Sequence, residues 1–332
     1  MIQVQNVQQQ PSQDVREQLY SQLEDYMGLS STKKKMDSSE KSGGTTLKRK
    51  SSEQSSSSSS SKALSKNTLA IKVNGKTIKG SAQNIVGRVV EAEMGASFRE
   101  EALKAQAVAA YTYIRYNNQK GTIPSLPAKS SVSAKVEDAV EQVIGEALYY
   151  QGEYINATYC ASNAGNSVDS ENVWGGYLPY LRSVESPGDT TLKAYGAVKR
   201  FSEEEIAQYI EENLDVDPYD YSDPDEWFED EEYINGRYVD SIRVCGKRLS
   251  GREAREELME FALPSAAFEV EYDDGEFIFT TYGYGHGVGM SQQGADYFAQ
   301  RGWDYEEILT HYYTGVTLKL SLIHISEPTR PY

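Results

Sequence analysis

The sequence has few of the residues that build metal sites, disulfide frameworks or nucleic-acid surfaces. Its 332 residues include 2 cysteines and 3 histidines, and none lies at the spacing of a metal motif. Basic residues number 33 against 50 acidic ones, giving a net charge of −17. This balance disfavours nucleic-acid binding, because phosphates require a basic stripe. We therefore expect no metal, no cofactor and no nucleic-acid partner, while the spacing of Cys160 and Cys245 leaves open whether they pair.

Long apolar runs are also missing. No stretch approaches the ~20 apolar residues of a membrane span, and no signal-peptide core is visible. We expect a soluble chain. If it acts outside the membrane, its export signal or anchor is not visible in this sequence.

Both ends of the chain are expected to lie outside the folded domain. Residues 1–66 are rich in Gln, Ser and Lys and contain the serine run Ser55–Ser61, which predicts a disordered linker. Within it, Gln13–Met27 could form a transient helix. Residues 321–330 resemble the translation of a transposase sequencing adapter, so we set aside 320–332 as a cloning or assembly artefact. The domain is expected over 67–319.

Strand and helix signals are mixed along this domain. Asn74-Gly75 between two β-type runs predicts a hairpin. Ser97 and Glu100 read as a capping box for a helix over about 98–117. Other helices are predicted near 82–94, 251–260 and before Tyr313, and strands near 237–244, 268–272 and 276–281, with short strands and loops over 147–181. The pattern predicts an α+β fold with helices packed on mixed or antiparallel strands.

One segment supplies most of the negative charge. Residues 202–232 contain 15 Asp or Glu and no Lys or Arg. We interpret this segment as an acidic insertion, which usually forms a solvated face or a mobile loop.

Glu93 is the carboxylate that helix periodicity singles out. It continues an apolar stripe made by Ile85, Val86, Val89 and Val90, whereas Glu91 lies about 200° around the helix and should face solvent. A carboxyl at the rim of an apolar face should have a raised pKa, which a glycosidic general acid needs. From pattern alone, a Glu that caps a helix or pairs with Lys104 remains the commoner interpretation.

The next helix has its own buried face, formed by Leu103, Ala107, Ala110 and Ile114. Lys104 and Gln106 could point towards Glu93, or they could be solvated.

A glycine-rich loop follows the last pair of strands. Gly283, Gly285, Gly287 and Gly289 stand at alternate positions, which implies unusual backbone angles or close backbone approach. The spacing is not that of a dinucleotide-binding loop, and no serine nucleophile elbow is present. His286, Ser291 and Gln292 are candidates for a functional role. A lone loop histidine is more often structural than catalytic, but the surrounding glycines, Ser291 and Gln292 give the two interpretations equal weight here.

These segments together resemble the stage II sporulation protein D (SpoIID) family, which includes amidase enhancers. Two motifs, Val89–Phe98 with Glu101–Ala110 and Gly285–Gln292 with Gly294–Ala295, are similar to its N- and C-terminal signatures. Val173–Pro187 and Ile308–Gly315 fit as well, so the resemblance covers about 67–318.

The resemblance implies a lytic transglycosylase that cleaves peptidoglycan strands stripped of stem peptides to 1,6-anhydromuramyl products. Its catalytic glutamate maps to Glu93, and the residues implied in substrate binding are Lys104, Gln106, Tyr111, Ser162, Asn163, His286, Ser291 and Gln292. The implied location is the cell envelope, at the outer face of the cytoplasmic membrane or the septal wall. Implied partners are a cell-wall amidase and a membrane-anchored sporulation protein. The alternative is a non-catalytic glycan-binding module that enhances an amidase.

The sequence departs from the family pattern at two places. Tyr111 stands where many members have Arg, and Cys160–Gly165 replaces a His-Ser-Thr-Ser-Gly-Gly type of loop. The ligands of the zinc site found in some members are also missing.

Overall fold

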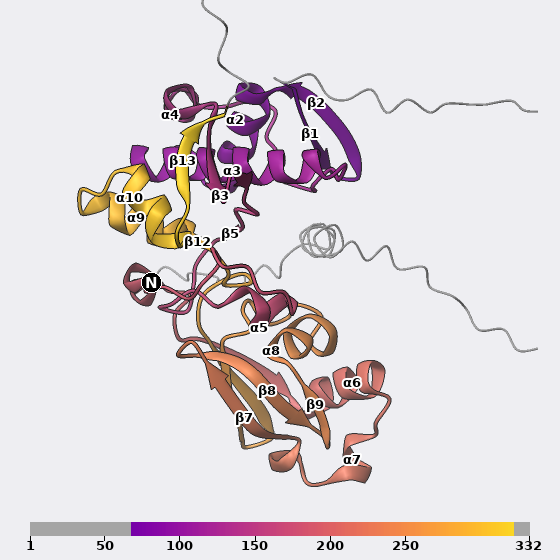
Figure 1. Cartoon of the computed structure of the whole chain (residues 1–332). Coiled ribbons are helices and arrows are strands. Elements are labelled where there is room, and N and C mark those ends of the chain that lie inside the picture. Colours follow the sequence, from indigo (N-terminus) through magenta and orange to yellow (C-terminus); the bar gives the residue numbers. More distant parts are fainter. Residues whose placement is uncertain (1–67, 322–332) are drawn as a thin grey trace, which may run out of the picture.

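The computed structural model describes residues 68–321, which fold around two hydrophobic cores. The upper lobe in Figure 1 holds the first core and the lower lobe holds the second. The expectations for the linker, for the helix at Gln13–Met27 and for residues 322–332 lie outside the described residues.

The upper lobe begins with the predicted hairpin. Strands β1 (Thr68–Val73) and β2 (Lys76–Ser81) pair antiparallel. Asn74 and Gly75 both have positive φ, 49° and 71°, as a two-residue hairpin turn requires. Helix α2 (Ala82–Glu93) follows at once, because the Ser81 hydroxyl accepts a hydrogen bond from the Asn84 N–H and so caps the helix.

Helix α3 (Glu100–Gln119) runs through the middle of the upper lobe and is buried on nearly every side. Its alanines let neighbouring elements approach closely. These neighbours are α2, α4 (Ala134–Val143), α9 (Gln292–Gln300), α10 (Tyr305–Tyr312) and β3 (Glu146–Tyr150).

A three-stranded sheet brings the C-terminal segment into the same lobe. Strand β3 pairs antiparallel with β4 (Glu153–Tyr154) on one side and with β13 (Thr317–Leu320) on the other. The strand therefore includes Leu320, one residue beyond the boundary expected from the sequence, and the Ser321 hydroxyl lies 2.7 Å from the Tyr154 hydroxyl.

The lower lobe is built from two antiparallel sheets with helices at their edges (Figure 1). One sheet has the order β10 (Phe268–Asp273), β11 (Glu276–Thr281), β6 (Ala197–Ser202), and the other has β7 (Phe228–Ile234), β8 (Tyr238–Val244), β9 (Lys247–Leu249). Its helices are α6 (Glu203–Leu214), α7 (Pro218–Tyr221), η2 (Pro224–Glu226), α8 (Gly251–Glu253) and the π-helical η3 (Ala254–Leu258). Trp227 stacks on Phe277 in the core, with ring centroids 5.4 Å apart. The predicted α+β class is confirmed.

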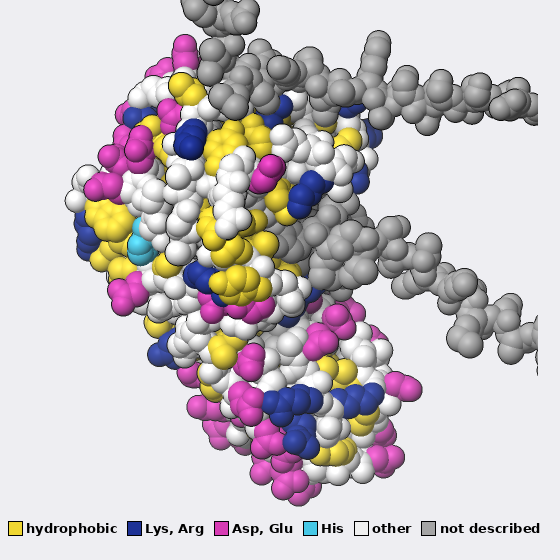
Figure 2. Space-filling view, in the orientation of Figure 1, with side chains coloured by type: hydrophobic (Ala, Val, Ile, Leu, Met, Phe, Trp, Pro, Cys, Tyr) yellow, Lys and Arg dark blue, Asp and Glu magenta, His cyan; other side chains and the backbone are white. Residues whose placement is uncertain are grey.

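The acidic segment forms ordered structure in this lobe. Ile206 and Ile210 of α6 and the Trp227 ring are buried in the second core, whereas all 15 carboxylates of the segment remain at least partly exposed. Acidic side chains gather on the surface of this lobe (Figure 2). The charge is therefore the solvated side of elements whose apolar side is packed, rather than a mobile loop.

The two lobes meet at a short parallel pair, β5 (Tyr159–Cys160) with β12 (Met290–Ser291) (Figure 1). Beside it lie α5 (Ser170–Trp174) and the 3-10 helix η1 (Pro187–Thr191). None of the helices within residues 68–321 combines the length and the hydropathy of a membrane-spanning segment.

The predicted capping box at Ser97 is wrong. Helix α3 has Arg99 at its N-cap and begins at Glu100, so Ser97 lies outside the helix start. The carboxylate of Asp296, from α9, accepts the Arg99 N–H at 2.7 Å and also pairs with the Arg99 guanidinium. The side-chain acceptor at the start of α3 thus comes from a residue 197 positions away and not from the local motif.

This arrangement predicts which substitution weakens the fold. Asp296→Ala should lower the free energy of unfolding by about 1 kcal/mol, because it removes the acceptor at the start of α3. Ser97→Ala is the matched control and should change stability little. Urea denaturation of both variants decides the matter. Equal decreases in the free energy of unfolding of the two variants would instead support the local capping box at Ser97.

Candidate functional site

Glu93 lies where α2 ends, at the edge of the first core. Its neighbours Val89 and Val90 are fully buried. Burial raises the pKa of the Glu93 carboxyl from 4.5 to about 7, against the opposing effect of a hydrogen bond from Gln292. The Gln292 Nε2 donates that bond to Glu93 Oε2 at 3.2 Å. The contact joins the two motifs that carry the family resemblance, whose residues here are 199 positions apart.

Glu91 has the opposite environment, and the expectation that it faces solvent is wrong. Its Oε2 accepts hydrogen bonds from the Ser133 N–H at 3.1 Å and the Ser133 hydroxyl at 2.7 Å, which leaves the side chain 13% exposed. The turn before α4 covers this side of α2, which helix phase cannot reveal. The Ser133 hydroxyl is the main reason that the pKa of Glu91 is lowered. The pKa values of two carboxyls two residues apart are therefore shifted in opposite directions.

Two buried polar groups lack hydrogen-bond partners in the part of the chain that the structure describes, and one of them, the Tyr159 hydroxyl, lies close enough to Glu93 to be affected by its charge. The Gln106 side chain is fully buried, and neither its amide oxygen nor its nitrogen is hydrogen-bonded. The Tyr159 hydroxyl on β5 is also unpaired. Gln106 approaches it, but not in the geometry of a hydrogen bond. Burial, followed by the charge of Glu93, raises the pKa of Tyr159 well above its usual value. A buried polar group without a protein partner usually forms a hydrogen bond with an ordered water or a ligand.

The glycine-rich loop packs directly against the chain around β5. Gly287 and Gly289 have positive φ, 78° and 79°. A Cβ at Gly287 would overlap the Tyr238 hydroxyl, and one at Gly289 would overlap the Thr158 carbonyl oxygen. The expectation of unusual backbone angles and close approach is confirmed. The close packing fixes the point from which Ser291 and Gln292 start α9.

His286 is held within this loop as a neutral ring. Its Nδ1 accepts the Val288 N–H at 3.1 Å, and the ring lies 5.0 Å from that of Trp174. Burial is the main cause that lowers the pKa of His286 to about 4. A neutral imidazole at ordinary pH can donate a hydrogen bond from Nε2, but it is a poor source of protons.

Ser291 and Asn163 meet at a carboxyl that the sequence did not single out, whereas Ser162 is held by the glycine-rich loop. The Ser291 hydroxyl and the Asn163 N–H both donate to Asp189, at 2.8 and 2.9 Å. Ser162 exchanges backbone hydrogen bonds with Tyr284 of the glycine-rich loop. Asp189 lies in the turn η1, and in a turn neither helix nor strand periodicity predicts which side chains are buried. The only sequence feature that could have identified Asp189 is its position just after the motif Val173–Pro187.

Lys104 and Tyr111 are not brought to Glu93. The Lys104 ammonium pairs with Glu101 at 2.8 Å and Glu100 at 3.1 Å, so the alternative in which it neutralises Glu93 is wrong. The Tyr111 hydroxyl accepts from Arg115 Nε at 3.1 Å and the ring is buried in the core. Tyr111 lies about 140° around α3 from Gln106, since an α-helix has 3.6 residues per turn.

Cys160 and Cys245, whose pairing the sequence left open, are both free and buried. The Cys160 thiol donates to Asn163 Oδ1 at 3.0 Å. Within residues 68–321, no group of three or more His, Cys, Asp or Glu side chains is arranged to hold a metal ion.

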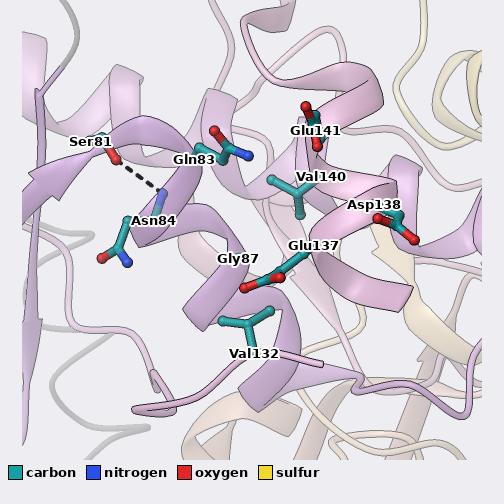
Figure 3. A pocket seen from close by; sticks show the side chains of 9 residues that line it. All are labelled: Ser81, Gln83, Asn84, Gly87, Val132, Glu137, Asp138, Val140 and Glu141. Carbon is teal, nitrogen blue, oxygen red and sulfur yellow. Dashed lines mark hydrogen bonds between the residues drawn. The ribbon is translucent and has the colours of Figure 1, made fainter. Parts of the chain in front are cut away.

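A pocket of about 330 Å³ lies on another side of α2 (Figure 3). Gln83 and Asn84 line it from α2, facing Glu137 and Val140 of α4. Asn84 is about half a turn out of phase with Glu93. The pocket therefore contains none of the residues expected in the site.

Comparison with known proteins identifies relatives of the chain. Residues 77–152, which include α2 and α3, match a family described as "Stage II sporulation protein". "Stage II sporulation protein D" of Bacillus amyloliquefaciens is 33% identical over 274 residues, covering 73% of this chain and 77% of that protein. The protein of the same name from Bacillus subtilis is 32% identical over 278 residues, with the same coverage. An "Amidase enhancer" of Bacillus subtilis is 27% identical over 295 residues, covering 69% of this chain and 39% of that protein.

The hydrogen bond from Gln292 predicts a measurable effect on Glu93. Gln292→Leu should raise the pKa of Glu93 further, because it removes the donor that favours the carboxylate. A pH titration of the protein labelled with ¹³C at Glu Cδ measures it, with Glu93→Gln assigning the signal. Gln293→Leu, one residue along α9, is the control and should leave the pKa of Glu93 unchanged. A Gln292→Leu titration that matches wild type would refute the contact.

Burial of Glu93 also makes stability depend on pH. The folded pKa of about 7 exceeds the ordinary 4.5, so the folded protein binds the extra proton between these values. The resulting stabilisation is present below pH 4.5 and is lost as pH rises through 7. Glu93→Gln should therefore be more stable than wild type at pH 8, by on the order of 2 kcal/mol, and nearly equal at pH 4.5.

Glu91→Gln provides the contrast by chemical denaturation at several pH values. Its lowered pKa gives stability that is present above pH 4.5 and lost as pH falls through the folded pKa, so this variant should be less stable than wild type at pH 8. The same sign for both variants at pH 8 would contradict the assignment.

Proposed function

Because this chain belongs to the stage II sporulation protein D family, we propose that it is a lytic transglycosylase that cleaves the glycan strands of peptidoglycan, with Glu93 as its acid. Members of the family take part in sporulation. The observation that carries the proposal is a carboxyl at an apolar edge whose pKa is raised to about 7 and which Gln292 holds in place.

One carboxyl suffices for this reaction. Ordinary glycosidases use two, since water must be activated or a covalent intermediate formed. In transglycosylation, protonated Glu93 gives its proton to the leaving glycosidic oxygen as the bond from C1 of the muramic acid breaks. The 6-hydroxyl of the same sugar then bonds to C1 and returns its proton to the Glu93 carboxylate. No water is consumed, and a pKa near 7 suits both transfers.

Three groups on β5, on α3 and in the glycine-rich loop are candidates to position a sugar. The Gln106 amide and the Tyr159 hydroxyl are polar atoms without hydrogen-bond partners among the described residues. Tyr284, whose backbone is hydrogen-bonded to Ser162, is 40% exposed and offers a flat face of the kind on which sugars stack. These features support a glycan substrate. We retain Ser162, Asn163, His286 and Ser291 as residues that shape the site.

The setting we propose is the septal wall or the outer face of the cytoplasmic membrane. The strands would be those already stripped of stem peptides, with a cell-wall amidase and a membrane-anchored sporulation protein acting alongside. The catalytic unit that we propose is the folded region, residues 68–321, with the acidic segment 202–232 as part of its lower lobe.

The second candidate is a non-catalytic glycan-binding module that enhances an amidase. The similarity to the amidase enhancer favours it. The same surface would then bind glycan without Glu93 transferring a proton.

The full chain should release 1,6-anhydromuramyl products from denuded glycan strands. Glu93→Gln should reduce release by at least ~10³-fold while still binding the strands, because only proton transfer is lost. The rate should fall as pH rises through about 7, as the acid form of Glu93 disappears. Product chromatography and glycan pull-down provide the two measurements.

Glu91→Gln is the matched control, since it alters a carboxyl two residues away that does not face the site, and its products should persist. If wild type binds the strands but releases no anhydro product, the enzyme is ruled out and the binding module is favoured. If neither binding nor release occurs, both candidates fall.

A further inference from the structure

Asp189 is a buried carboxyl that joins three separate segments. It is 1% exposed. Its Oδ1 accepts the Ser291 hydroxyl at 2.8 Å, and its Oδ2 accepts the Ser186 hydroxyl at 2.7 Å and the Asn163 N–H at 2.9 Å. The loop after β5, the turn η1 and the start of α9 are thereby tied to one side chain.

The neighbours of Asp189 are arranged to donate. The Asn163 N–H, which donates to Asp189 Oδ2, can act only as a donor. The Ser291 oxygen already accepts the Gly294 N–H at 2.8 Å as the N-cap of α9, so its hydroxyl hydrogen is directed to Asp189. The Ser186 hydroxyl lies 2.7 Å from the Tyr312 hydroxyl, and since Ser186 donates to Asp189, Tyr312 must donate to Ser186. These three donors, the Ser291 hydroxyl, the Ser186 hydroxyl and the Asn163 N–H, form a cage around Asp189. Both side-chain oxygens of residue 189 must therefore be hydrogen-bond acceptors.

The cage leaves no space for adjustment at the first turn of α9. A Cβ at Gly294 would overlap both the Tyr312 hydroxyl and the Ser186 hydroxyl. Ser291 is fully buried. The next residue is Gln292, whose amide reaches Glu93. The position of that amide therefore depends on how Ser291 is held.

We propose that Asp189 is a positioning residue: it anchors Ser291 and the first turn of α9 so that Gln292 reaches Glu93, although Asp189 does not itself contact Glu93. Only the kinetic part of this inference rests on the proposed function. Among the described residues, Cys160, Tyr238 and Tyr312 lie close enough to Asp189 for its charge to raise their pKa values. Because all three are neutral at ordinary pH, no cation among them could replace the hydrogen bonds that hold the carboxyl.

The test is Asp189→Asn in the full chain. This substitution keeps the shape but replaces one acceptor oxygen with an NH₂ donor, which must face a donor of the cage. The Glu93 signal in a ¹³C titration should move to a higher pKa by about one unit, as in Gln292→Leu, because the amide no longer reaches the carboxyl. On glycan strands kcat should fall about tenfold with KM little changed, as expected when a group acts on the chemical step alone.

A double-mutant cycle separates positioning from general weakening of the fold. In the Gln292→Leu background, Asp189→Asn should add little further effect on the pKa of Glu93 or on kcat, since the link is already broken. Thr190→Val, in the same turn, is the control. It removes an exposed hydroxyl that bonds to Pro187, and it should leave both quantities at wild-type values.

The outcomes are distinct. A folded Asp189→Asn protein with an unchanged pKa of Glu93, or with effects that add fully to those of Gln292→Leu, overturns the inference. If Asp189→Asn does not fold, Ser291→Ala takes its place, since Asp189 then keeps two of its donors, and the same shift is expected. If wild type releases no anhydro product, the proposed function fails, while the titration still decides the role of Asp189.

Discussion

The hydrogen bond from Gln292 to Glu93 joins residues 199 positions apart, and the candidate site exists only where it forms. Its geometry depends on α3, against which both α2 and α9 pack. It also depends on the glycine-rich loop, which approaches the chain before β5 so closely that a side chain at Gly289 would not fit. The packing around α3 and the geometry of the glycine-rich loop thus both determine whether the Gln292 amide reaches the Glu93 carboxyl.

Different interactions set the pKa values of the carboxyls in and around the site. Burial raises the pKa of Glu93 to about 7, so that its neutral and charged forms are both populated near pH 7, whereas Ser133 stabilises the charged form of Glu91. Burial also raises the pKa of Asp189, to about 6, despite three donated hydrogen bonds. Keeping two carboxyls buried at neutral pH costs stability, which the two hydrophobic cores offset. Such placement is typical of sites where a proton must be held and released.

Much of the fold could be predicted from short-range pattern. The hairpin at Asn74-Gly75, the helices α2 and α3 and the strands β8, β10 and β11 follow from local propensity and periodicity, because each depends on residues close in sequence. The buried stripe ending at Glu93 was predicted for the same reason. Where a partner came from elsewhere in the chain, prediction was wrong: Asp296 replaced Ser97 as the cap of α3, and Ser133 covered Glu91.

The sequence by itself determined the class of fold, the phase that separates Glu93 from Glu91, and, through its motifs, the family. Only the tertiary structure decided that Ser133 covers Glu91, that Tyr111 is fully buried in the core, and that Asp189 stands behind Ser291. The physical reason is the range of the forces involved. Periodicity reports which side of an element is buried, but the partner that buries it, and so the proton affinity of a carboxyl there, is set by segments far away in the chain.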